Sequence, residues 1–68
     1  MIQHMNISRS DISFIIDEWI FSERDRKLLK RRLLDGILYE DLADEFSLSV
    51  RQVKNIVYKG EQIIIRHI

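Results

Sequence analysis

Apolar residues recur at helical spacing along the chain, and polar residues fill most positions between them. The first apolar stripe consists of Ile12, Ile15, Ile16, Trp19 and Ile20. This i, i+3, i+4, i+7, i+8 spacing predicts an amphipathic helix over residues 10–21. We expect Trp19 in the core beside the isoleucines, with a contact to a partner as the alternative. Ser8 or Ser10 can cap its start, and Ser8 with Asp11 has the spacing of a capping box.

A second helix is predicted over residues 22–35. Ser22 followed by Asp25 repeats the start signal, and Phe21 stands where a hydrophobic staple would pack. The predicted inward positions are Leu28, Leu29, Leu33 and Leu34. Gly36 can end this helix, because glycine adopts the left-handed conformation that other residues resist.

Residues 38–66 have the pattern of two helices joined by a short turn. The apolar positions are Leu42, Ala43 and Phe46 in the first helix and Val53, Ile56 and Val57 in the second. Only residues 46–48 separate the two patterns, which is the connection length of a helix-turn-helix. Ser49 is placed to cap the second helix, Ala43 is small enough for a close helix crossing, and Leu48 would fill the space between the helices.

The last nine residues, GEQIIIRHI, fit two interpretations. Ile56, Gly60, Ile63, Ile64 and His67 continue the helical stripe. Three consecutive isoleucines also favour a strand, and Gly60 weakens a helix interior by roughly 1 kcal/mol. We favour a helix that extends to about Arg66.

The outward face of the last predicted helix carries hydrogen-bond donors and amides but no acid. Its residues are Arg51, Gln52, Lys54, Asn55, Tyr58 and Lys59. Arg reads guanine and Asn reads adenine through paired hydrogen bonds, and Lys and Gln can hold phosphate. This face therefore suits the major groove of DNA. The alternative is a helix pair that only packs a core, with a basic face that is simply solvated.

The helix pair resembles the helix-turn-helix of bacterial sigma factor region four. The matching segments are Asp35-Gly36, Tyr39 to Ala43, Phe46 to Ser49, Val53-Lys54 and, in the preceding helix, Glu23-Arg24 and Leu28 to Leu34. Related domains are the output domains of response regulators and small phage or mobile-element regulators. The resemblance covers residues 22–66. Leu38 stands where a capping Ser or Thr is common in the family, and Ser47 replaces a frequent Gly.

The resemblance implies a transcriptional regulator that binds double-stranded DNA through its last helix. Carried onto this chain, Arg51 and Asn55 would meet base edges, and Val50 could touch a thymine methyl group. Gln52, Lys54 and Lys59 would hold phosphate, with Tyr58 on the same face. Lys30 and Arg31 on the second helix are candidates for contacts with the DNA backbone. The family also contacts RNA polymerase or another transcription protein, which adds a second expected class of partner.

The net charge of the chain does not favour DNA binding as its only function. Eleven basic and eleven acidic residues cancel, whereas stand-alone DNA binders usually carry a basic excess. The charges form blocks, with net +3 over residues 22–36, −4 over residues 37–49 and +3 over residues 50–68. Such blocks can present a basic side to DNA and an acidic side to a protein. The alternative function is therefore a protein-interaction module of the same fold, without specific DNA binding.

Composition limits the other function classes. The chain has no Cys, so neither a disulfide frame nor a zinc finger is available. His4 and His67 stand alone near opposite ends, and we expect no metal site, no cofactor and no enzymatic activity. No apolar run reaches the roughly 18 residues of a membrane span, and the segment MIQHMNIS lacks the features of a signal peptide. We expect a bacterial or phage protein of the cytoplasm.

Taken together, the patterns predict an all-α fold, a small bundle of about four helices in one domain over residues 1–68. Sixty-eight residues bury little apolar area, so a partner or a second copy would help such a chain stay ordered. The isoleucines of the last six residues, Ile63, Ile64, Ile65 and Ile68, predict exposed apolar surface and hence a two-fold homodimer. The alternative is that the N-terminal helix folds over these isoleucines and completes the monomer.

Overall fold

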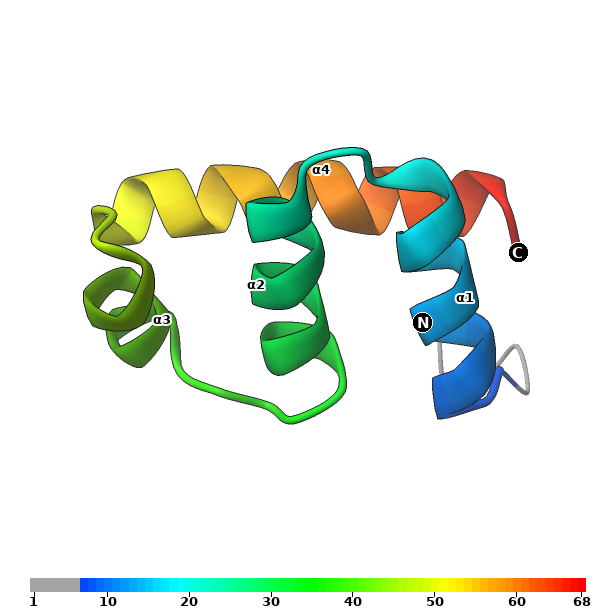
Figure 1. Cartoon of the computed structure of the whole chain (residues 1–68), viewed down its shortest axis with the longest axis horizontal. Helices are drawn as coiled ribbons and strands as arrows, with labels where there is room; N and C mark the ends of the chain where they lie inside the picture. Colours follow the sequence, from blue (N-terminus) through cyan, green and yellow to red (C-terminus); the bar gives the residue numbers. More distant parts are fainter. Residues whose placement is uncertain (1–6) are drawn as a thin grey trace.

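The computed structural model describes residues 7–68, and this part of the chain folds into four α-helices without a strand. They are α1 (Arg9–Trp19), α2 (Glu23–Leu33), α3 (Tyr39–Phe46) and α4 (Val50–Arg66). The other three helices pack against α4, which runs along the length of the molecule in Figure 1. The predicted all-α bundle of about four helices is confirmed.

Local signals in the sequence set the helix ends. Ser8 caps α1 through a capping box with Asp11, and Ser22 accepts a hydrogen bond from the backbone N–H of Asp25 at the start of α2. Gly36 lies beyond the end of α2 with a φ of 69° and donates to the carbonyl of Arg32 at 3.1 Å. The backbone can therefore leave α2 in the left-handed conformation that only glycine adopts without strain.

The core forms where the three shorter helices meet α4. Its buried members are Ile12, Ile15, Ile16 and Ile20 from α1 and its end, Leu28 and Leu29 from α2, Leu42 and Ala43 from α3, and Val53, Val57 and Ile64 from α4. These are the positions that the helical spacing predicts, because one side of each helix faces the others.

Gly60 lies buried inside α4, which continues to Arg66, so the strand alternative for the last residues is wrong. A Cβ atom at position 60 would lie 2.5 Å from Leu29 Cδ2 and 2.6 Å from Leu29 Cδ1. Carbon atoms that are not bonded normally stay about 3.5–4.0 Å apart. The glycine therefore lets α2 approach α4 closely, which offsets its poor helix propensity.

Two aromatic side chains lie outside the core, against prediction. Trp19 is 46% exposed, and its ring stacks on His67 with centroids 3.9 Å apart. Trp19 is the last residue of α1, and Ile16 and Ile20 fill the core at that level. Phe21 is 80% exposed and forms no staple. The residue that a staple would need, one turn into α2, is the polar Arg26, which donates instead to the carbonyl of Ile20.

Within residues 7–68, no helix combines the length and the apolar character that crossing a membrane requires. His4, one of the two histidines considered as isolated residues, lies outside the described part of the chain.

Candidate nucleic-acid interface

The turn between α3 and α4 is fixed by hydrogen bonds at both of its ends. Ser47 has a left-handed backbone, with φ 57° and ψ 44°, and the N–H of Leu48 donates to the carbonyl of Ala43 at 2.9 Å. Ser49 then caps α4, because its Oγ accepts from the N–H of Gln52 at 3.1 Å and its own N–H donates to Gln52 Oε1 at 2.9 Å. The start of α4 therefore has a defined direction relative to α3.

Apolar contacts hold α4 in that direction. Val53 and Val57 are buried on the side of α4 that faces the core, to which α3 contributes Leu42 and Ala43. Leu48 is half-buried against the same core, as its predicted place in the turn requires. Because one helical stripe of α4 is buried, the opposite stripe is directed to solvent.

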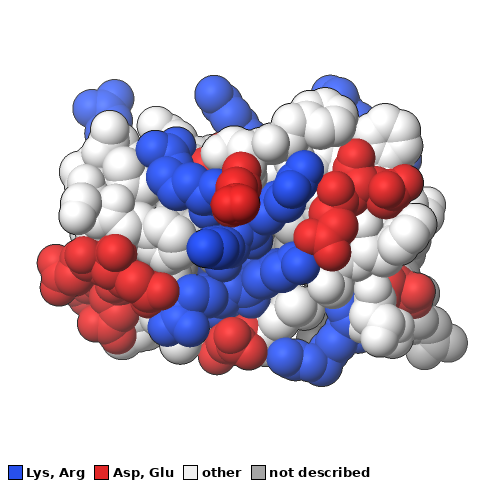
Figure 2. Space-filling model, in the orientation of Figure 1, with Lys and Arg blue, Asp and Glu red and all other residues white. Residues whose placement is uncertain are grey.

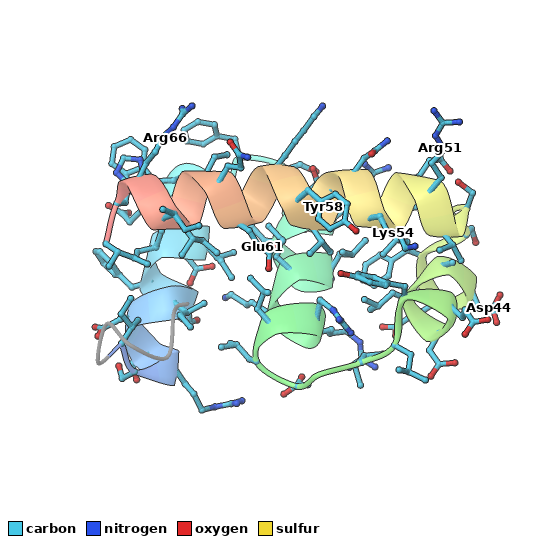
Figure 3. All side chains as sticks on the ribbon, turned by 180° about the vertical axis from the view of Figure 1, so that it is seen from behind. Asp44, Arg51, Lys54, Tyr58, Glu61 and Arg66 are labelled. Atoms are coloured by element: carbon cyan, nitrogen blue, oxygen red, sulfur yellow. The ribbon has the colours of Figure 1, made fainter. Side chains whose placement is uncertain are left out.

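That outward surface is polar and, over its first three turns, free of acids. The exposed residues there are Arg51, Gln52, Lys54, Asn55, Tyr58 and Lys59, and the first acid of α4 is Glu61. Figure 3 shows Arg51 and Arg66 projecting from one edge of α4, with Tyr58 across the side that faces the viewer. Arg51 and Asn55 are one helical turn apart, so their side chains leave the same edge. We call the exposed residues of 50–59 the α4 face.

Three residues predicted to contact DNA have additional contacts within the protein. The Oε1 atom of Gln52 is occupied by the cap of α4, which leaves its amide NH₂ as a donor. Val50 is half-buried and packs against the core. Lys54 lies with Nζ 5.7 Å from the centre of the Tyr39 ring, which also carries the Arg32 guanidinium at 4.1 Å. Such contacts attract a cation to the ring and restrict the Lys54 side chain.

Lys30 and Arg31 pair with acids of neighbouring helices, so their charges are partly neutralised. Lys30 Nζ lies 2.7 Å from Asp17 of α1, and Arg31 Nε lies 2.8 Å from Glu45 of α3. Figure 2 shows Lys and Arg gathered over α2, between Asp and Glu of the helices on either side. On this face of the molecule, the basic and acidic blocks of the sequence therefore lie side by side (Figure 2).

Two parts of the basic surface around the α4 face were not predicted from the sequence. Arg66, with Gln62, lines a shallow hollow beside Tyr58 and Lys59, which extends the polar edge toward the end of α4. The length predicted for α4 could have indicated this extension. Arg24 of α2 lines a second hollow with Asn55 and Lys59, and its guanidinium pairs there with Asp25, whose Oδ1 lies 3.1 Å from Arg24 Nη2. No sequence pattern indicates Arg24, because its place depends on how α2 crosses α4.

The described residues include no group of three or more His, Cys, Asp or Glu side chains that could hold a metal ion. Comparisons of the chain with protein-family models, with curated proteins and with solved structures gave no match.

Proposed function

We propose that this protein is a sequence-specific DNA-binding transcriptional regulator in which α4 is the recognition helix. The observation that carries the proposal is the α4 face: exposed and acid-free, on a helix whose start is capped and braced by α3. A rigid helix with exposed donors near its N-terminal end is the element that helix-turn-helix proteins insert into the major groove.

Arg51 and Asn55 are the proposed readers of base edges. They lie in the first two turns of α4, both are exposed, and one turn of helix separates them. An Arg side chain donates two parallel hydrogen bonds to guanine, and an Asn side chain pairs with adenine by one donor and one acceptor. Val50 keeps part of its surface exposed for a thymine methyl group.

Phosphate contacts would come from Lys54, Lys59 and the NH₂ group of Gln52, with Arg24 and Arg66 at the edges of the same surface. If three or four phosphates are neutralised, the logarithm of the binding constant should fall with the logarithm of salt concentration with a slope of roughly −3. Such a slope is modest, as expected for a chain without net charge. The proposal involves no cofactor and no catalytic step, and it implies a cytoplasmic setting in a bacterium or phage-infected cell.

Fluorescence anisotropy with duplexes selected from a random pool tests this function. Arg51→Ala should weaken binding to the best site by about 1–3 kcal/mol and relax one base position. Lys30→Ala is the matched control, because it removes the same unit charge from α2, where the Lys30 side chain already pairs with Asp17 of α1. Equal losses for both variants, or no binding of any duplex at low salt, would refute the proposal.

A second candidate is a protein-interaction module that binds RNA polymerase or another transcription protein. Two observations favour it, namely the zero net charge and the exposed aromatic side chains at the α1 end of the molecule. The same titration separates the two functions. A chain with this second function alone would bind random and selected duplexes equally weakly.

A further inference from the structure

The end of the molecule where α1 meets the last turn of α4 carries a group of exposed apolar side chains. This aromatic patch consists of Phe14, Trp19, Phe21, Ile65 and Ile68. Trp19 lies between two hollows: one is lined by Phe14, Trp19 and Ile68, and the other by Trp19 and Phe21 together with residues of α2 and α4. The isoleucine cluster expected from the sequence contributes less, because Ile64 is buried and Ile63 is half-buried.

We propose that the aromatic patch is the contact surface for a second copy of this chain, in a two-fold dimer. Phe14, Trp19 and Phe21 are 64%, 46% and 80% exposed. With about 200 Å² for each aromatic side chain, these fractions correspond to roughly 380 Å² of apolar surface. A standard interface buries about 800 Å² per partner, of which about 450 Å² is apolar. Ile65 and Ile68 bring the patch close to that value.

The charges around the aromatic patch have both signs. They are therefore more complementary to a second copy of this chain than to a partner whose surface is uniformly acidic or uniformly basic. Asp11 lines the hollow beside Phe14 and Trp19, and α1 exposes Glu18 further along, whereas Asp17 pairs with Lys30 of α2. Arg66 follows Ile65 in the last turn of α4, is exposed and lines the neighbouring hollow with Tyr58 and Lys59. In a two-fold contact, a residue i of one copy that touches residue j of the other is matched by residue j of the first copy touching residue i of the second. Such a contact can therefore place the Arg66 of one copy near Asp11 of the other, twice.

This surface is separate from the start of the α4 face. Arg51 and Arg66 project at opposite ends of α4 in Figure 3, and the fifteen residues between their positions rise about 22 Å along a helix. A dimer through the aromatic patch therefore leaves Arg51 uncovered. Dimerisation would be a property additional to the DNA contact. The hollow that runs from Trp19 to Phe21 is also lined by Arg24, Asn55 and Lys59, so the dimer contact would border these residues of the proposed DNA surface.

Sedimentation equilibrium of the complete chain between 10 and about 200 µM, a range that spans affinities typical of weak dimers, tests the proposal. We expect a species of twice the 8.2 kDa chain mass at the upper concentrations. The double variant Phe14→Ser with Phe21→Ser should weaken dimerisation by about 100-fold or more, because large buried aromatics dominate interface energy. Leu38→Ser is the matched control: Leu38 is 60% exposed, lies before α3 and should leave the dimer unchanged.

Trp19 gives a second, local measurement, since it is the single tryptophan of the chain. Dilution of the native protein should dissociate the dimer. As the dimer is lost, the Trp19 emission should shift to the red and acrylamide should quench it more strongly. Helical circular dichroism should stay unchanged in the double variant, because both replaced rings are exposed. A native chain that sediments at 8.2 kDa throughout overturns the proposal. So does a dimer that the double variant retains, or one whose formation leaves Trp19 emission unaltered.

Discussion

Replacing Gly60 by alanine should destabilise the protein, although alanine is the better helix former. In an open helix position this change gains about 1 kcal/mol. Here the new Cβ would lie 2.5 and 2.6 Å from the two methyl carbons of Leu29, which is 1% exposed. Leu29 would have to move about 1 Å within a packed core, and overpacking of this kind costs about 1–3 kcal/mol. Because two methyl groups are in conflict, we expect an overpacking cost in the upper part of that range. After the gain in helix propensity is subtracted, the free energy of unfolding should fall by about 1.5 kcal/mol.

Thermal unfolding followed by circular dichroism measures this loss. For a domain of this size, 1.5 kcal/mol corresponds to a fall in Tm of about 6–12 °C. The decisive control is the same change in a Leu29→Ala background, where all three atoms nearest to the new Cβ are absent. There Gly60→Ala should raise the free energy of unfolding by about 1 kcal/mol. All four chains should be compared in one osmolyte solution, because Leu29→Ala alone costs about 2–5 kcal/mol.

A reversal of sign between the two backgrounds would locate the conflict at Leu29. If Gly60→Ala were neutral or stabilising in the native chain, α2 would not approach α4 as closely as the structure has it. If it destabilised both backgrounds equally, the cause would lie elsewhere, for example in the helix backbone.

Three further changes test the remaining features. Ser47→Gly should stabilise the protein by about 0.5–1 kcal/mol in urea unfolding. The left-handed backbone of Ser47, with φ 57°, costs about 1–2 kcal/mol for a residue with a side chain. Glycine removes this cost but increases the chain entropy of the unfolded state, which offsets part of the gain. Leu38→Ser should add about 1 kcal/mol in the same assay, since Leu38 has extended cap geometry without a side-chain hydrogen bond; no gain would mean that α3 is capped by other means. Lys59→Ala should weaken binding to all duplexes alike and lower the salt slope by about 1, as salt-dependent anisotropy would measure; loss of one base preference alone would contradict a phosphate role.

The helices could be predicted from the sequence because their signals are local. Spacing of isoleucine, leucine and valine identifies the buried side of each helix, and Ser8, Ser22 and Ser49 mark three of the four starts. Predicted and observed ends differ by two residues or fewer. The continuation of α4 to Arg66 also follows from the helical spacing of its apolar residues, provided that Gly60 can lie inside a helix.

Features that depend on packing between helices could not be predicted in the same way. Trp19 falls on the apolar stripe of α1, but the space beneath it is filled, and its ring covers His67 instead. Lys30 looks like a free cation in the sequence, yet it reaches Asp17, thirteen positions earlier. Arg24 joins the surface of Asn55 only because α2 crosses α4 at that point. Each outcome depends on distances across the fold, which residue spacing does not encode.

For the candidate site, the sequence indicated the α4 face by residue type, and the structure adds its exposure and its rigid start. Arg51 and Asn55 are exposed as their place outside the apolar stripe requires. It stays a prediction that Arg51 and Asn55 contact bases and that Lys54 and Lys59 contact phosphate.

The most direct test of the DNA-binding proposal is to map amide chemical shifts of the ¹⁵N-labelled protein while a selected duplex is added. The proposal predicts that the largest changes fall on residues 49–59, with smaller ones at Arg24 and Arg66 and little change over Lys30–Leu34. Largest changes over α1 and the end of α4, around Phe14 and Ile68, would contradict a recognition role for α4 and would assign the contact to the aromatic patch instead.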